Sequence, residues 1–280
     1  MLLLKIFNKL KLLHYVNLIG EVTLNGVIFK IPVIKKLGIG NVYMSEPWMI
    51  SLLKKLNLQD GQFIDVGVNI GQTMLKLKSV NKEIAYIGFE PNPTCVFYSN
   101  ELIQINQFKN TTIIPTGIAD KNGILKLNFY SNNVSDPSAS IVADFRPDQA
   151  VKYSQYIPVN TISNLSETIS LNNVEAIKID VEGAELEVIE SLKDLIAKNQ
   201  PVILIEILPV YTDDNKVRLE RQQKIEAILK ELNYLIYRVK KLDNKFESIV
   251  QIETLGIHND LNACDYVLMP KTKIIKGLNE

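Results

Sequence analysis

The 280-residue sequence has few of the side chains that build metal centres and disulfide frameworks. Its two cysteines, Cys95 and Cys264, lie far apart and lack metal-ligand spacing, so we expect two reduced, buried thiols. Its two histidines, His14 and His258, are too few for a histidine-rich metal site. We therefore predict no metal site from these residue types.

The sequence also lacks an excess of charge and a long apolar run. It has 31 basic and 31 acidic residues, whereas a nucleic-acid-binding protein usually needs a basic face, so no nucleic-acid partner is expected. No apolar stretch is long enough to span a bilayer, and no small-residue cleavage site follows the first residues. We expect a cytoplasmic protein.

The first 15 residues are predicted to form an amphipathic helix with a basic face. Leu3, Phe7 and Leu10 fall at helical spacing, and three lysines interrupt the apolar stretch. Such a helix packs on the core, contacts a second subunit in a homodimer, or lies on a membrane surface. The sequence leaves these alternatives open, peripheral membrane contact among them.

Residues 1–58 are predicted to be an N-terminal accessory region. Residues 20–33 alternate like a strand pair, with Asn25 and Gly26 at the turn. Pro47 then opens a predicted helix that places Trp48 on its apolar face.

Residues 59–280 are predicted to form one α/β domain. Short apolar strands alternate with helices, which indicates a mostly parallel sheet covered on both faces. The predicted strands are residues 62–66, 83–89, 111–118, 176–181, 201–207, 234–239 and 264–270. The last two have no clear helix between them, because the linker 240–263 is polar. We therefore expect a doubly wound, Rossmann-like sheet of seven strands with an antiparallel edge hairpin.

The first strand of this domain leads into a glycine-containing turn. Gly67 and Gly71 permit a tight turn and close approach of a ligand to the backbone. Glu90 follows the second strand, where a carboxylate can accept hydrogen bonds from both hydroxyls of a ribose. Together they predict a nucleoside site at the carboxyl ends of the strands.

The turn favours S-adenosylmethionine over a dinucleotide. Asn69 occupies the middle position of the glycine pattern that binds a pyrophosphate. Asp65 lies at the mouth of the turn, where a carboxylate repels a pyrophosphate but suits the ammonium of a methionine group. The alternative reading of Asp65 is a cap on the following helix.

Four segments in order, FIDVGVNIGQT, FEPNP, GIADKNG and IKIDVEGAE, resemble the FkbM family of methyltransferases. The resemblance covers roughly residues 63–209 and implies a class I fold, S-adenosylmethionine as methyl donor, and O-methylation of a sugar, polysaccharide or natural-product hydroxyl. It implies the following residues at the cofactor: Asp65, Gly67, Asn69, Gly71 and Thr73 at the methionine part, Glu90 at the ribose, and Asn92, Ala119 and Asp120 beside the adenine. Family members often have a histidine where this sequence has Leu208, so a histidine-assisted mechanism is not expected.

Three carboxylates at strand ends are the candidate catalytic residues. Asp180 and Glu182 end one predicted strand, and Glu206 lies near the end of the next. An alcohol needs a base or a cation to become a nucleophile, so we predict Asp180 as general base or acceptor-positioning group with the other two in support. Clustered carboxylates raise one another's pKa values or gather a divalent cation. The alternative for Glu182 is a cap on the helix that starts at Ala184.

Residues 131–160 are predicted to form an irregular, polar cap over the small-molecule or glycan acceptor. The hydroxylated and basic residues in it that can reach a substrate are Ser135, Ser138, Ser140, Arg146 and Tyr153. An ordinary flexible insertion is the alternative.

Two other functions stay open from sequence. An NAD-linked oxidoreductase or epimerase needs a pyrophosphate-binding turn and a tyrosine–lysine pair on a helix, and neither is found. A non-catalytic nucleoside-binding scaffold requires only the fold.

Overall fold

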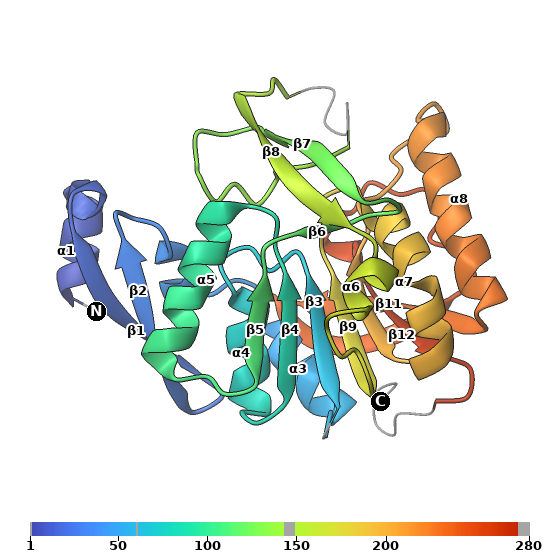
Figure 1. Cartoon of the computed structure of the whole chain (residues 1–280), viewed down its shortest axis with the longest axis horizontal. Coiled ribbons are helices and arrows are strands. Elements are labelled where there is room, and N and C mark those ends of the chain that lie inside the picture. Colours follow the sequence, from blue (N-terminus) through green and yellow to red (C-terminus); the bar gives the residue numbers. More distant parts are fainter. Residues whose placement is uncertain (1, 60, 143–148, 274–280) are drawn as a thin grey trace.

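The computed structural model describes residues 2–59, 61–142 and 149–273. Its centre is an eight-stranded sheet covered by helices on both faces (Figure 1). The strands of this sheet are β3 (Gln62–Val66), β4 (Ala85–Phe89), β5 (Thr111–Ile114), β9 (Val174–Ile179), β10 (Val202–Glu206), β11 (Tyr234–Leu242), β12 (Lys245–Ile252) and β13 (Asp265–Pro270). The predicted doubly wound, mostly parallel fold is confirmed.

The strands run across the sheet in the order β12-β11-β13-β10-β9-β3-β4-β5. Strands β5, β4, β3, β9 and β10 are parallel, and β13 inserts antiparallel between β10 and β11. The order reverses between β3 and β9, so the carboxyl ends of these two strands form the switch point at which α/β sheets bind ligands. The antiparallel pairing of β11 with β13 was predicted. The edge strand of the sheet is β12, which was not predicted.

Strand β12 corrects the prediction of a polar loop over residues 240–263. Residues Asp243 and Asn244 have φ of 49° and 59°, which makes the tight hairpin that joins β11 to β12. Alternate residues of β12 then pack inward, with Ile249 buried and Val250 exposed. The remaining part of the linker contains a short 3₁₀ turn, Leu261–Ala263.

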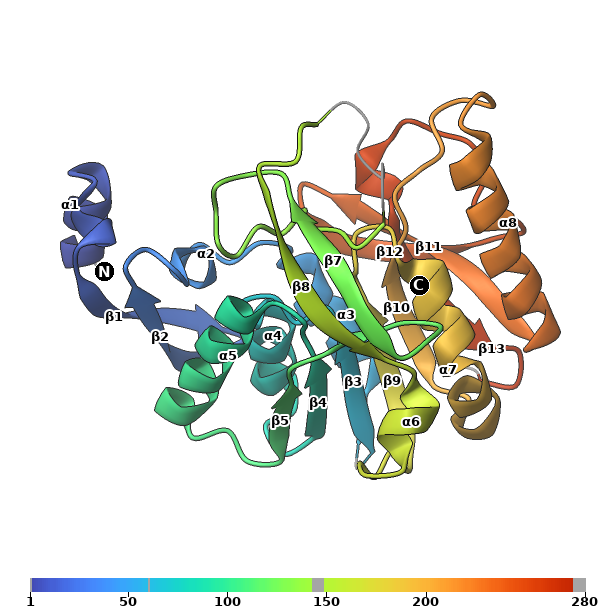
Figure 2. The ribbon, with the colours of Figure 1, turned by 45° about the horizontal axis from the view of Figure 1, so that its top comes forward.

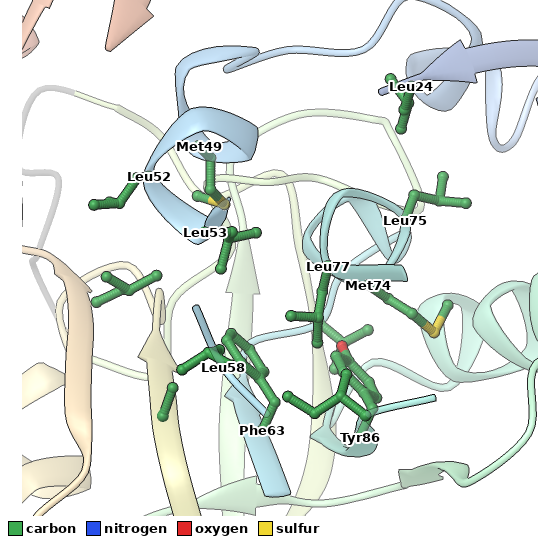
Figure 3. Packing of buried hydrophobic residues seen from close by; sticks show 14 of the residues in the cluster. Leu24, Met49, Leu52, Leu53, Leu58, Phe63, Met74, Leu75, Leu77 and Tyr86 are labelled. Atoms are coloured by element: carbon green, nitrogen blue, oxygen red, sulfur yellow. The ribbon is translucent and has the colours of Figure 1, made fainter. Parts of the chain in front are cut away.

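The two faces of the main sheet have separate cores. Helices α3 (Trp48–Leu56), α4 (Gln72–Val80) and α5 (Pro93–Asn106) cover one face, and α6 (Ile162–Ser166), α7 (Glu185–Asn199) and α8 (Lys216–Glu231) cover the other. Period-two alternation sends Phe63 and Tyr86 to the first core and Ile64 and Ile87 to the second. Figure 3 shows the first core, where the Phe63 and Tyr86 rings stack with centroids 6.2 Å apart.

The N-terminal segment contributes buried side chains, Leu24 and Phe29 among them, to the first core. Its elements are α1 (Leu2–Lys9), the 3₁₀ turn Leu12–His14, the antiparallel pair β1 (Asn17–Leu24) and β2 (Val27–Ile34), and α2 (Ile39–Val42). The predicted hairpin turn at Asn25 and Gly26 is confirmed, because both have positive φ. The N-terminal helix is shorter than predicted and ends at Lys9, before Lys11 adopts a left-handed conformation.

A small third sheet stands over one end of the main sheet (Figures 1 and 2). It comprises β6 (Gly117–Ile118), β7 (Gly123–Phe129) and β8 (Tyr153–Asn160), with β8 in the middle. The prediction of one irregular stretch over 131–160 is therefore wrong for its last eight residues. Alternation within β8, where Ile157 and Val159 are buried and Tyr156 and Pro158 exposed, is the sequence signal of this strand.

In the part of the chain that the structure describes, no helix is both long and apolar enough to cross a membrane. The side chains of Ile6, Leu10, Leu12 and Tyr15 are exposed near the N-terminus, whereas Leu4 is buried. Membrane contact and dimerisation through this segment stay predictions.

Candidate active site

The turn after β3 packs directly against the end of β9. Gly67 has φ of 92°, and a Cβ at this position would lie 1.9 Å from the backbone oxygen of Asp180. Asn69 and Gly71 also have positive φ, and Gly71 forms the N-cap of α4. Glycine at position 67 is therefore needed for the close approach that brings Asp180 beside the turn.

Two hollows meet at this point. The first, here called the inner crevice, lies at the carboxyl ends of β3, β4 and β9. Its lining includes six of the predicted cofactor and catalytic residues, which follow different strands: Gly67, Asn69, Glu90, Asn92, Asp180 and Glu182. The structure thus brings residues from β3, β4 and β9 to one cavity.

Glu90 lies in the inner crevice with both carboxylate oxygens hydrogen bonded. The backbone N–H of Asn69 donates to one oxygen at 2.7 Å, and that of Asn92 donates to the other at 2.8 Å. Burial raises the pKa of Glu90 to about 7, although these two backbone donors lower it. A carboxylate has lone pairs left for further donors, so both oxygens can still accept hydrogen bonds from a diol.

Asn92 links the crevice to the loop that follows β7. Its side-chain oxygen accepts from the backbone N–H of Thr94 and caps α5, while its amide donates to the backbone oxygen of Val134 at 2.8 Å. Asn92 therefore fixes the position of the 131–142 loop at the mouth of the crevice.

Asp65 does not line the inner crevice, contrary to prediction. Its side chain is fully buried and accepts a 2.6 Å hydrogen bond from the Tyr86 hydroxyl. Burial raises the pKa of Asp65 to about 6, while Lys178 and Tyr86 oppose the rise. The strand continues through Val66, so Asp65 faces the core between β3 and the covering helices rather than the strand end. The alternative of a helix cap is also wrong, since Gly71 caps α4 without a side chain.

The structure places the other predicted cofactor residues in different parts of the molecule. Thr73 is buried in the first turn of α4 and lines the second hollow, not the inner crevice. Ala119 is buried in the core of the small sheet, and Asp120 is exposed. Neither of these two residues lines the inner crevice, because the chain leaves it after Ile118 to enter the turn before β7.

An apolar wall of the inner crevice was missed by the sequence reasoning. It is made by the small sheet and the loop after β7, through Ile118, Leu127, Ala139, Ile141 and Ile157. Recognising β8 as a strand would have found Ile157, whereas the loop residues give no periodic signal. This wall gives the crevice one apolar side opposite the carboxylate of Glu90.

The second hollow, here called the outer cleft, has an empty volume of about 1980 Å³. It is lined by the segment after β2, by the loop before β8, and by all three predicted catalytic carboxylates, Asp180, Glu182 and Glu206. Asp180 and Glu182 line the inner crevice as well. The predicted clustering of the three carboxylates is therefore present, at the junction of the two hollows.

The carboxylates at the junction differ in their surroundings. The buried Lys178 ammonium donates to Asp180 Oδ2 at 2.8 Å. Burial, with smaller contributions from Asp180, Asp265 and Glu182, raises the pKa of Glu206 to about 9. Glu206 is consequently protonated at neutral pH while Asp180 is held in an ion pair.

Glu182 has φ of 51°, and its backbone oxygen accepts from the Ser140 hydroxyl. At the first turn of α7, the Glu185 carboxylate accepts a hydrogen bond from the backbone N–H of Gly183.

Among the described residues, no group of three or more His, Cys, Asp or Glu side chains is arranged to hold a metal ion.

The residues predicted to reach an acceptor are only partly in place. Ser135 lines the outer cleft, whereas Ser138 bonds Asp136 within the loop and Tyr153 stacks on Phe129. Arg146 lies outside the described residues.

Comparison with known proteins decides the family. The model of the FkbM methyltransferase domain matches residues 65–236, more than half of the chain. The chain belongs to the FkbM methyltransferase family. This confirms the resemblance in the sequence and sets aside the NAD-linked alternative. Membership of this family implies that the cofactor is S-adenosylmethionine.

Two relatives are methyltransferases of fungi. Methyltransferase 1 of Beauveria bassiana (strain ARSEF 2860) is 23% identical over 150 residues, which cover 48% of this chain and 59% of the relative. Methyltransferase sdnD of Sordaria araneosa is 24% identical over 165 residues, which cover 49% of this chain and 63% of the relative. The FkbM methyltransferase domain here thus spans about three fifths of the length of these curated relatives.

Solved structures with a similar fold include an FkbM methyltransferase from Methylobacillus flagellatus KT, with a TM-score of 0.46 and 16% identity over 75% of this chain and 43% of that chain. Another is the S-adenosylhomocysteine-bound methyltransferase PaMTH1 of Podospora anserina, with a TM-score of 0.42 and 11% identity. The match covers 80% of this chain and 76% of that chain.

The inner crevice of this FkbM methyltransferase fits an adenosine group in its chemistry. Glu90 offers two acceptor oxygens to a diol, and the apolar wall around Ile118 and Ile157 suits a flat ring. Asn69 extends from the inner crevice into the outer cleft and lines both. Among the described residues that line the crevice, none has a basic side chain that would favour a diphosphate.

Proposed function

We propose that this FkbM methyltransferase transfers a methyl group to a hydroxyl oxygen of a sugar or natural-product acceptor bound in the outer cleft. One observation carries the proposal: Asp180 and Glu182 line both hollows, so an acceptor in the outer cleft can meet a carboxylate at the edge of the inner crevice. Proximity of this kind is a large part of catalysis of group transfer.

The cofactor is assigned to the inner crevice. Glu90 would hold the ribose, Asn92 would flank the base, and Gly67 with Asn69 would border the methionine group. When bound, S-adenosylmethionine supplies a methyl group activated by a sulfonium. Gly71 and Thr73 would act at a distance, through the shape of the turn, because neither lines the inner crevice.

Asp180 is the proposed general base. Lys178 occupies Oδ2 of this carboxylate, which leaves Oδ1 to accept the hydroxyl proton of the acceptor as its oxygen forms the new bond to carbon. Glu206, which carries a proton at neutral pH, can donate a hydrogen bond to the acceptor, and Glu182 borders the same space.

The proposal is tested by separating cofactor binding from methyl transfer. We expect Asp180→Asn to bind S-adenosylhomocysteine within about threefold of the parent in titration calorimetry, while transfer from methyl-labelled S-adenosylmethionine falls by about 10²-fold or more. Glu90→Ala should instead lose binding. The acceptor panel contains mono- and oligosaccharides, phenols and amino sugars, and we expect the label in methyl ethers.

Asp120→Asn is the matched control, because it makes the same chemical change at an exposed position outside the crevice. It should bind and transfer like the parent. Full turnover by Asp180→Asn, or label found on the amino-sugar nitrogen, would contradict the proposal.

A further inference from the structure

The wall of the outer cleft far from the inner crevice is basic. Lys35 and Lys36, with His14 beside them, line the outer cleft but not the inner crevice, whereas Asp180 and Glu182 line both. The side chains of Lys35, Lys36 and His14 are exposed. The outer cleft therefore has a basic outer end and a carboxylate-lined inner end.

The turn that carries the two lysines is held in place by the backbone. Ile34 and Leu37 exchange N–H to O hydrogen bonds of 3.0 and 2.9 Å, and the N–H of Lys35 donates to Val16 O and to Asn17 Oδ1. Both lysines have positive φ, at 46° and 75°, which is uncommon for side-chain-bearing residues. Their side chains consequently start from a fixed turn at the cleft wall.

Among the described residues, neither lysine has a carboxylate that neutralises its charge. Within the described chain the ion pairs involve other cations, and no acidic oxygen lies within 4.0 Å of Lys35 Nζ or Lys36 Nζ. Positive charge that faces a cleft without an internal partner is available to a ligand.

Three of the four acidic side chains that line the outer cleft are paired or protonated and do not cancel this charge. Glu46 is paired with Lys76 at 2.9 Å and Asp180 with Lys178 at 2.8 Å. Burial and the neighbouring carboxylates raise the pKa of Glu206 to about 9, so it is neutral at pH 7. The fourth acidic side chain, Glu182, also lines the inner crevice, whereas Lys35 and Lys36 do not, so the end of the cleft with the two lysines can attract an anion.

We infer that the acceptor carries an anionic group, a phosphate or a carboxylate, which binds at Lys35 and Lys36 while the hydroxyl to be methylated reaches Asp180. This inference rests on the proposed function, because it places the acceptor in the outer cleft. It narrows the acceptor from any hydroxylated sugar or natural product to an acidic one. His14 borders the same end and can donate a hydrogen bond to the anion.

The test compares three sugars that differ in charge. Glucose 6-phosphate, glucuronic acid and methyl α-glucoside are titrated into the full chain and followed by ligand-observed NMR, with and without S-adenosylhomocysteine. We expect Kd for at least one anionic sugar to be about tenfold lower than for the neutral one at low salt, with the preference falling as salt rises. The phosphate and carboxylate arms identify the preferred group.

Two charge-reversal variants separate a local from a global effect. Lys35→Glu with Lys36→Glu should abolish the preference, whereas Lys198→Glu with Lys224→Glu should keep it. The control has the same change in net charge, and its exposed lysines lie on α7 and α8, across the main sheet. Neither double variant should change the affinity for S-adenosylhomocysteine.

Equal binding of the three sugars, or equal loss of the preference in both double variants, would overturn the inference. These outcomes leave the proposed function standing if Asp180→Asn still separates binding from transfer. A parent chain that fails to bind S-adenosylhomocysteine would instead refute the proposed function, while the preference for anionic sugars is measured without the cofactor.

Discussion

Glu90 titrates near neutrality, and its assigned role requires the ionised form. Burial raises its pKa to about 7 against the opposing effect of two backbone donors. Ribose hydroxyls donate to a carboxylate, so cofactor binding favours the ionised state and competes with protonation. Affinity for S-adenosylhomocysteine should therefore rise with pH up to about 7 and level off above it.

The slope below the pKa is expected to approach about tenfold per pH unit. Calorimetric titrations from pH 5.5 to 8.5 measure it. Glu90→Gln should bind at least about tenfold more weakly and without this pH dependence, while Asp120→Asn should follow the parent. A parent profile that is flat over this range would remove Glu90 from the ribose site.

Glu206 makes the stability of the protein depend on pH. Its folded-state pKa of about 9 exceeds the ordinary glutamate pKa of 4.5, so between these values the folded state binds more protons than the unfolded state. The free energy of unfolding contributed by this group is largest below pH 4.5 and is lost progressively as pH rises toward 9. Glu206→Gln keeps the size and removes the ionisation.

We expect Glu206→Gln to melt at a higher temperature than the parent at pH 8.5, with a difference that shrinks toward pH 5. Each kcal/mol corresponds to about 2–4 °C in a chain of this size. Glu253→Gln, at an exposed position of the same carboxylate type, is the control and should follow the parent. A constant difference at all pH values would show that burial does not raise the pKa of Glu206.

At the scale of elements, the contact between the β3 turn and β9 depends on Gly67. A Cβ there would meet the Asp180 backbone oxygen at 1.9 Å, and φ is 92°. Gly26 has a similar φ of 79°, but a Cβ at that position meets nothing within 4 Å. Both alanine variants pay about 1–3 kcal/mol for the backbone conformation, and only Gly67→Ala must also move β9.

Urea unfolding should thus give a clearly larger loss of stability for Gly67→Ala than for Gly26→Ala. Methyl transfer should fall in the first variant alone, because Asp180 moves with its backbone. Equal losses of stability in both variants would mean that the turn yields without displacing β9.

The alternation of strands and helices predicted the fold because each element's pattern is local. It also predicted that Glu90 and Asp180 lie at the same edge of the sheet, because the carboxyl ends of parallel strands share one edge. The bounds of strand β3 were predicted correctly, but Asp65 was taken to face the turn, whereas its side chain points to the same face of the sheet as Phe63 and Tyr86. Ala119 and Asp120 were misplaced because the chain enters the turn before β7 sooner than the family motif implied.

Other parts of the site depend on contacts that no local pattern contains. The basic wall at Lys35 faces the carboxylates only because the β1–β2 hairpin packs on α5, where Asn106 exchanges hydrogen bonds with the backbone of Lys30. The raised pKa of Glu206 likewise requires carboxylates from three strands or strand ends. Long-range packing of this kind becomes visible only in the folded chain.

At the scale of the whole molecule, the sequence division at residue 58 runs through a core. Helix α3 buries Trp48, Met49, Leu52, Leu53 and Leu56 in the same cluster as residues of β3, α4 and β4 (Figure 3). Removing a buried leucine or tryptophan side chain typically costs about 2–5 kcal/mol, and a whole domain has only about 5–15 kcal/mol of stability. Strands β1 and β2 also bury Leu24 and Phe29 in this cluster, but they form a separate sheet. We therefore propose that α3 is part of the catalytic domain and that only the segment before Ser45, whose strands pair with no strand of the main sheet, is accessory.

Two truncations test this boundary. A chain that starts at Ser45 keeps α3 and the Glu46–Lys76 ion pair, so it should fold with a lowered melting temperature. It should bind S-adenosylhomocysteine within about threefold of the parent, because the inner crevice has no lining residue before Val66. It should also lose the preference for anionic sugars, because Lys35 and Lys36 are removed.

A chain that starts at Gln59 exposes the apolar side chains that α3 covers and should give no cooperative melting transition. Cooperative unfolding of this shorter chain, or loss of cofactor affinity in the longer one, would place the boundary elsewhere.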